Sequence, residues 1–254
     1  MKEDGKLFWG QGMKAGGSNA GEACTVLRES EIIDCRMLPR GSNDVFLLSL
    51  RRGRQTIRAI YKPQRGEYPL WDFPDGTLYQ RECAAYLVSE GLKWSLIPPT
   101  IIREGPFGVG AVQWFVPTNA VLDDALFEKH LSEFKRIAAF DWLTNNADRK
   151  VGHCLVGTDG RIWLIDHGLT FHEVPKLRTV IWHFAGQPVP EEILADLDLF
   201  SHRLTDESTL RATLSELLAL TEVEALEERL SIILRNPVFP YSFGSRHRVP
   251  WPPY

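Results

Sequence analysis

The pattern of apolar positions divides this chain into a first half that predicts strands and a second half that predicts mainly helices. Short apolar runs at residues 45–50 and 56–62, separated by an Arg-Arg-Gly-Arg turn, predict a β-hairpin. Two further runs, at residues 100–102 and 111–116, are joined by a Gly/Pro-rich turn and predict a second pair of strands. Pro117 then interrupts the chain, and most apolar residues beyond it recur at helical spacing.

Helices are predicted between and after these strands. Thr77 can cap a helix that continues to Ser89, and residues 123–142 carry apolar side chains near helical spacing. The final third of the chain has three helical patterns. Pro190 starts one of them, and a capping-box pattern at residues 221–224 starts another.

A strand-rich half, a helical half and a proline break between them predict an α+β fold of two lobes with a cleft. The glycine-rich start of the chain shows no periodicity, and its end is rich in proline and aromatic residues. We therefore expect a flexible N-terminal arm at 1–30, a β-rich N-lobe at 31–117, a mainly helical C-lobe at 118–236 and a C-terminal tail at 237–254.

Two aspartates, Asp148 and Asp166, bracket a predicted hairpin of residues 153–165. Because a hairpin folds back on itself, the residue before it and the residue after it come out at the same end, and the two carboxylates converge. Two unpaired carboxylates so close would raise the pKa of one of them, so with a basic residue nearby they suit a divalent metal ion and a phosphate group. The alternative is a surface pair that caps the hairpin.

Two further features could meet the phosphates of a ligand. Lys62 ends a predicted strand, and Glu82 on the next helix could hold its ammonium group in the cleft. The alternative is a surface lysine and a solvated glutamate. The turn Gly41-Ser42-Asn43 could present backbone N–H groups to phosphates, although it also suits a simple loop before a strand.

Composition excludes several classes of function. The formal net charge of −4 gives no general attraction to nucleic acid, and no segment approaches the roughly 20 apolar residues of a membrane span. The four cysteines lie far apart with no Cys-x-x-Cys pair, so we expect reduced thiols, with a zinc site as the alternative. We expect a cytoplasmic protein without a nucleic-acid partner and without integral membrane association.

The order of these features resembles the protein-kinase-like fold, and most closely its atypical branch. That branch contains the catalytic domains of phosphatidylinositol 3- and 4-kinases, especially the type II lipid kinases, and the HipA-type kinases. The loop Asp-Arg-His-x-x-Asn of that family is similar to residues 148–153, its Ile-Asp-x-Gly sequence is similar to residues 165–168, and Lys62 with Pro63 fits its strand lysine. Residues 61–78 also resemble an actinobacterial family described as phosphatidylinositol-kinase-like.

The resemblance covers roughly residues 40–175 and implies an ATP-dependent phosphotransferase that acts on a hydroxyl group of a protein or small molecule. Asp148 would accept the proton of that hydroxyl, and Asp166 would hold Mg²⁺ or Mn²⁺. Lys62, oriented by Glu82, would pair with the α and β phosphates.

The resemblance implies roles for two other groups of residues. Lys150 replaces the family's loop histidine and would neutralise charge on the transferred phosphoryl group, while Arg149 of the same catalytic loop is expected to brace it through an ion pair. Four consecutive residues would line the adenine pocket, with their backbone reading the base edge and their apolar side chains stacking on the ring: Gln113, Trp114, Phe115 and Val116.

This sequence departs from the family pattern at two places. His153 stands where the family has an asparagine ligand, and a neutral imidazole favours softer ions than Mg²⁺, which indicates Mn²⁺. After Gly168 there is little room for a long substrate-recognition loop, so lipid specificity does not follow. These departures leave open the alternative of a nucleotide-binding pseudokinase. A third alternative is an enzyme that transfers the nucleotidyl (AMP) group, which kinase-like sites can do if ATP sits reversed. His167 and His172, with His153, would allow zinc, but their neighbours are aspartates of a phosphate-type motif.

Overall fold

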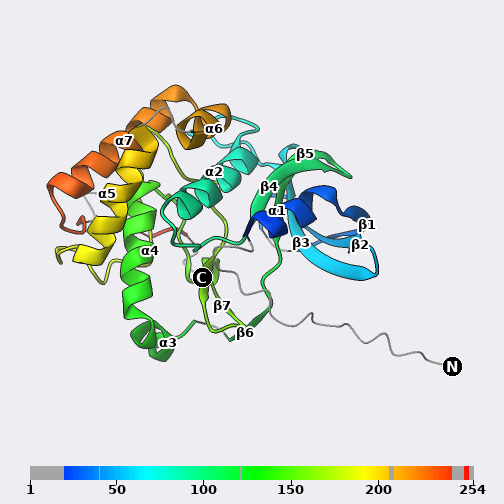
Figure 1. Ribbon diagram of the computed structural model, residues 1–254, viewed down its shortest axis with the longest axis horizontal. Helices are drawn as coiled ribbons and strands as arrows, with labels where there is room; N and C mark the ends of the chain where they lie inside the picture. Colours follow the sequence, from blue (N-terminus) through cyan, green and yellow to red (C-terminus); the bar gives the residue numbers. More distant parts are fainter. Residues whose placement is uncertain (1–19, 40, 121, 206–208, 242–248, 252–254) are drawn as a thin grey trace.

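The computed structural model describes residues 20–39, 41–120, 122–205, 209–241 and 249–251. They form two lobes, one built around a five-stranded sheet and the other mainly helical (Figure 1). The α+β, two-lobed architecture expected from the hydrophobic pattern is confirmed.

The sheet of the N-lobe is antiparallel throughout, with the strand order β1-β2-β3-β5-β4. Both predicted strand pairs are present as neighbouring strands in it. The strands are β1 (Glu31–Met37), β2 (Phe46–Arg52), β3 (Gln55–Pro63), β4 (Thr100–Gly105) and β5 (Gly108–Trp114).

A helix, α1 (Ala20–Glu29), precedes the sheet and packs on the side of β4 and β5. Ala23, Val26 and Leu27 are its buried side chains, and their spacing of three and four residues places them on one helical face. The prediction of a flexible arm is therefore wrong for residues 20–29, because this short apolar stripe has a sheet to pack against. Residues 1–19 lie outside the described part of the chain.

Strand β3 presents alternate residues to opposite faces of the sheet, as a strand must. Ala59 and Tyr61 are fully buried in the core of the N-lobe together with Leu48 and Val112. Lys62 follows Tyr61 and therefore points to the other face, where its side chain is 21% exposed. The period of the strand places this lysine on the face opposite the N-lobe core.

Helix α2 (Leu78–Gly91) lies between the sheet and the helices of the C-lobe, and most of its 14 residues are buried (Figure 1). Thr77 precedes it, but the Thr77 hydroxyl donates to the carbonyl of Pro74 rather than capping the helix. The first backbone N–H groups donate instead to the carboxylate of Glu67, at 3.1 and 2.7 Å. The predicted cap is thus corrected: a carboxylate from the preceding loop satisfies the free donors at the start of α2.

The C-lobe is an assembly of helices, and two of its predicted boundaries need correction. The helix expected over 123–142 is divided at His130 into two helices. The last helix begins after Ala219, whose backbone N–H donates to Glu222 Oε2 at 3.1 Å, rather than at Thr221. The helices are α3 (Asp124–Lys129), α4 (Leu131–Leu143), α5 (Glu191–Thr205), α6 (Thr209–Leu217) and α7 (Leu220–Arg235).

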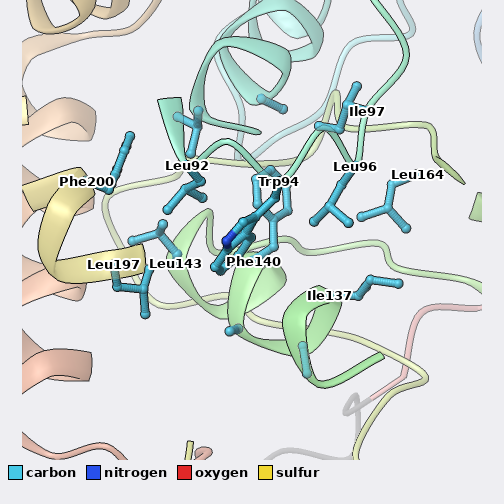
Figure 2. Packing of buried hydrophobic residues seen from close by; sticks show 14 of the residues in the cluster. Leu92, Trp94, Leu96, Ile97, Ile137, Phe140, Leu143, Leu164, Leu197 and Phe200 are labelled. Atoms are coloured by element: carbon cyan, nitrogen blue, oxygen red, sulfur yellow. The ribbon is translucent and has the colours of Figure 1, made fainter. Parts of the chain in front are cut away.

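The largest hydrophobic core lies within the C-lobe and reaches the end of α2 (Figure 2). Figure 2 shows Trp94 beside Phe140 of α4, with Leu197 and Phe200 of α5 to their left in the cluster. The indole N–H of Trp94 donates to the carboxylate of Asp196 at 2.7 Å, so its polar atom is satisfied. This core fixes α4, which leads directly into the loop that carries Asp148.

A small three-stranded sheet stands beside this core and carries the predicted hairpin. The turn η2 (Val151–His153) leads into β7 (Cys154–Gly157), which pairs with β8 (Ile162–Leu164), as expected. The third strand, β6 (Thr118–Ala120), pairs with the other edge of β7 and was not expected, because Pro117 indicates a break in the chain. The hairpin brings the residues before β7 and after β8 to one end.

The tail after α7 is described only in part. Phe239 is buried and contacts Phe184, while residues 242–248 and 252–254 lie outside the described residues. Along the described stretches of the chain, no helix is both long enough and apolar enough to cross a membrane.

Candidate functional site

Lys62 and Asp166, which belong to different lobes, meet in the structure. Lys62 Nζ lies 3.0 Å from Asp166 Oδ1 and also pairs with Glu82 Oε1. Burial works against the charged form of Lys62, but Asp166 and Glu82 outweigh it and raise the pKa of the ammonium group. The sheet lysine, the helix glutamate and the aspartate after the hairpin therefore form one connected set of charges.

Glu82 has an exposed fraction of only 3% and joins the two lobes. Its second oxygen, Oε2, accepts a hydrogen bond from the backbone N–H of His167 at 3.0 Å. The carboxylate thus holds Lys62 on one side and the segment next to Asp166 on the other. The alternative of a solvated glutamate is wrong for this position.

Asp166 occupies the left-handed region of the backbone, with φ of +64°. For a residue other than glycine this conformation is costly and persists only where neighbouring contacts fix it. The half-exposed carboxylate interacts with Lys62 through Oδ1 and with His153 Nε2 through Oδ2, at 3.2 Å. The Lys62 ammonium, more than any other group, lowers the pKa of Asp166 well below its usual range.

His153 lies where the sequence places a metal ligand. Burial lowers the pKa of His153 to about 4, so its imidazole is neutral at physiological pH; Nε2 faces Asp166 and Nδ1 accepts from the backbone N–H of Lys150 at 3.5 Å. An imidazole nitrogen and a carboxylate oxygen in contact fit Mn²⁺ better than Mg²⁺, which prefers oxygen. Within the described residues no three His, Cys, Asp or Glu side chains gather as a metal site, so a zinc site has no support there.

Asp148 lies in the loop between α4 and the hairpin, with its side chain 23% exposed. Burial raises the pKa of Asp148, and the ammonium group of Lys150, 3.1 Å from Asp148 Oδ2, partly opposes that shift. A carboxylate with a raised pKa accepts a proton more readily, which suits a general base. Lys150 thus lies next to the base, where it can also meet a charged group in the cleft.

Arg149 is fully buried and does not reach the cleft. Its Nη2 atom donates to Asp141 Oδ1 at 2.9 Å, and its Nη1 atom donates to the carbonyl of Ile165 at 3.2 Å. Arg149 is therefore not a catalytic residue in the sense of touching substrate. It braces the loop through an ion pair, as the sequence analysis expects of it.

The turn Gly41-Ser42-Asn43 is anchored to the loop that follows β3. Gly41 has φ of +113°, which favours glycine, and Asn43 Oδ1 accepts from the backbone N–H of Tyr68 at 2.7 Å. The Asn43 side chain is thus engaged in holding the turn, and the backbone N–H groups of this segment remain candidate contacts to phosphates.

The predicted adenine segment differs in part from expectation. Gln113 is buried and its amide donates to the Thr100 hydroxyl at 2.9 Å. The backbone N–H of Trp114 donates to Pro99 and that of Phe115 donates to Arg58. These two N–H groups are already used, so the expectation that they read the base edge is corrected, because β5 continues its pairing into this segment. The half-buried side chains of Trp114, Phe115 and Val116 remain as candidate ring contacts.

Sequence reasoning does not identify the roles of three buried polar residues behind the site: it assigns no role to Asp141 or Asn146, and it considers His167 only as a zinc ligand. All three have an exposed fraction of 0%. A signal for Asp141 was available, because it is the one charge in the apolar stretch 137–143 of a predicted helix. A charge buried in such a stretch requires a partner, and Arg149 follows eight residues later.

The described residues have an atypical protein-kinase-like fold. A crystal structure of the Golgi casein kinase with Mn/ADP bound is similar to this chain with a TM-score of 0.58 at 14% identity, covering 85% of this chain and 74% of that chain. A second crystal structure of the Golgi casein kinase has a TM-score of 0.50 at 15% identity, with the same coverage. At such low identity the likeness shows the fold alone.

The sequence itself shows a nearer relationship. The chain is 38% identical over 265 residues to Protein Rv2133c of Mycobacterium tuberculosis (strain ATCC 25618 / H37Rv), across 90% of this chain and 94% of that protein. The chain belongs to the same family as Protein Rv2133c. No family model matches it.

Proposed function

We propose that this protein is an ATP-dependent phosphotransferase of the atypical, phosphatidylinositol 3-/4-kinase-like class that phosphorylates a hydroxyl group of a protein or small molecule. The observation that carries the proposal is the contact of Lys62 with both Glu82 and Asp166. A lysine held by a helix carboxylate next to a candidate metal-binding aspartate is the arrangement with which kinase-like proteins position nucleotide phosphates.

The residues of the catalytic loop supply the remaining roles. Asp148 accepts the proton of the acceptor hydroxyl while the oxygen of that hydroxyl bonds to the γ-phosphorus. The bond from the γ-phosphorus to the β–γ bridging oxygen breaks, and ADP leaves. Lys150, beside Asp148, neutralises charge on the transferred group. Because this chemistry depends on position and charge, no covalent intermediate with the protein is required.

Asp166 and His153 would hold a divalent ion, Mn²⁺ in preference to Mg²⁺. When bound, such an ion neutralises negative charge on the nucleotide phosphates. Mg²⁺ and Mn²⁺ commonly use one or two protein ligands and complete their shell with phosphates and water, so two protein ligands are sufficient. Lys62 would pair with the α and β phosphates, and the side chains of Trp114 and Phe115 would contact the adenine ring.

One experiment tests the proposal against its alternatives. The purified protein is incubated with Mn²⁺ or Mg²⁺ and ATP labelled on either the α or the γ phosphate, together with the variants Asp148→Asn and Asp166→Asn. We expect label to be transferred from the γ position only, and both variants to lose transfer. Transfer from the α position would indicate nucleotidyl transfer, and binding without transfer would indicate a pseudokinase.

A further inference from the structure

A buried carboxylate lies behind the candidate site and contacts the supports of both aspartates. Asp141 of α4 has an exposed fraction of 0%. Its Oδ1 atom accepts from Asn146 Nδ2 at 2.9 Å and from Arg149 Nη2 at 2.9 Å, and its Oδ2 atom accepts from Arg149 Nε at 3.0 Å. Two separate connections therefore start at one side chain.

The first connection leads to Asp148. With its Nδ2 atom held by Asp141, Asn146 directs its Oδ1 atom to the backbone N–H of Asp148, at 2.9 Å. Asn146 is itself fully buried, so its amide has no water with which to exchange these partners. The orientation of Asn146 thus fixes where the Asp148 backbone lies.

The second connection leads to Asp166 through Arg149. Arg149 Nη1 donates to the carbonyl of Ile165 at 3.2 Å, and Arg149 Nη2 contacts His167 Nε2 at 2.9 Å. Arg149 therefore holds the residue before Asp166 and the residue after it. Because a guanidinium group only donates, His167 Nε2 accepts from Arg149. These contacts on both sides of Asp166 explain how it keeps its positive φ.

We propose that Asp141 is a shared positioning residue, which places Asp148 through Asn146 and Asp166 through Arg149 and His167. This inference rests on the proposed function for the roles of Asp148 and Asp166, but the hydrogen bonds that carry it do not depend on catalytic activity. It predicts that the two connections can be broken separately and that each break changes a different property of the site. A merely structural role would lower stability without separating those properties.

The test uses one variant for each connection in the full-length chain. Asn146→Ala removes the acceptor from the Asp148 N–H, and we expect kcat for γ-phosphate release from ATP to fall by about 10- to 100-fold while the affinity for Mn²⁺ stays unchanged. His167→Leu removes the acceptor from Arg149, and we expect the affinity for Mn²⁺ to fall by about 10- to 100-fold. His167→Gln keeps an acceptor and should recover most of that affinity.

Ser89→Ala is the matched control. Ser89 Oγ accepts from the backbone N–H of Leu96 at 2.8 Å, outside both connections that start at Asp141, so this variant also removes one side-chain acceptor from one buried backbone donor. It should change neither kcat nor the affinity for Mn²⁺. If Ser89→Ala and Asn146→Ala lower kcat equally, or if His167→Leu and His167→Gln bind Mn²⁺ alike, Asp141 is only a structural residue and the proposal is overturned.

Hydrogen exchange measured by mass spectrometry separates this inference from the proposed function. Asn146→Ala should speed exchange in peptides covering 147–150 but not in those covering 165–168, and His167→Leu should do the reverse. If the wild-type protein transfers no phosphate, the proposed function is refuted. The hydrogen-exchange pattern and the affinity for Mn²⁺ still test the positioning role of Asp141 in that case. Uniform acceleration in both regions by either variant would overturn the positioning role. Asp141→Asn, if it folds, should weaken both connections together.

Discussion

The ion pair of Lys62 and Glu82 gives a quantitative prediction, because its two members depend on one another unequally. Glu82 is 3% exposed, and besides Lys62 its described partner is a single backbone N–H, that of His167. Lys62 retains a second carboxylate partner in Asp166. Lys62→Met therefore leaves a buried charge with one donor, whereas Glu82→Gln leaves a lysine that is still paired and an amide that can still accept.

The expected losses of unfolding free energy follow from these contacts. Lys62→Met should cost about 3–5 kcal/mol, the usual result of removing one partner from a buried ion pair. Glu82→Gln should cost about 1–3 kcal/mol, because charged hydrogen bonds become neutral ones. The double variant should cost no more than Lys62→Met alone, since the contact that Lys62 loses with the half-exposed Asp166 contributes only about 0–1 kcal/mol.

The assay is urea unfolding of the wild type, the two single variants and the double variant, with the slope m compared to verify that the same surface is exposed. The difference between the double variant and the sum of the single variants is the coupling free energy of the pair. The reasoning is refuted if the sum of the two single losses equals the loss in the double variant to within about 0.5 kcal/mol. It is also refuted if Glu82→Gln is more damaging than Lys62→Met.

Three further predictions concern pH, metal preference and chemistry. The fold lowers the pKa of His153 from 6.5 to about 4, so between these pH values the unfolded chain binds a proton that the folded protein does not bind. The free energy of unfolding should therefore decrease by up to about 3 kcal/mol as the pH falls from 6.5 to 4. Urea unfolding of His153→Asn should show a flatter profile there; an unchanged profile contradicts the assignment. His153→Asn should also shift metal preference from Mn²⁺ toward Mg²⁺ in ATP turnover, and an equal preference in both proteins argues against a ligand role. Asp148→Asn should lower kcat by about 10²–10⁴-fold with little change in nucleotide affinity measured by equilibrium binding, and retention of kcat excludes Asp148 as the base.

Much of the fold could be predicted because its elements follow local rules. The strands on either side of the Arg-Arg-Gly-Arg turn are short apolar runs, and the hairpin between Asp148 and Asp166 has a turn with two glycines. Helix α1 could not be predicted with the same ease, because its stripe of three small or branched residues is stabilised only by packing against the sheet. The strand β6 depends on pairing with a distant strand, which local pattern does not record.

The candidate site divides in a similar way. Residues whose chemistry is visible in their type and order, such as Lys62 and Asp166, could be placed opposite one another from the sequence. The partners of buried polar groups could not, because hydrogen-bond geometry is set by the folded backbone. The Glu82 carboxylate shows this, since it accepts from the backbone N–H of His167 in the other lobe and nothing in the sequence pairs the two.

The lysines and aspartates of the site neutralise each other in pairs, and this has a consequence for metal binding. Lys62 contacts Asp166 Oδ1, the other oxygen of the carboxylate that faces His153, and Lys150 contacts Asp148. A cation binding without nucleotide must displace or repel the Lys62 ammonium, so Lys62→Met should bind Mn²⁺ more tightly than the wild type in the absence of nucleotide, measured by titration calorimetry. Lys150→Met removes an equal charge from the neighbouring aspartate and should have a smaller effect. Weaker Mn²⁺ binding by Lys62→Met would mean that Lys62 holds Asp166 in its binding position rather than competing for it.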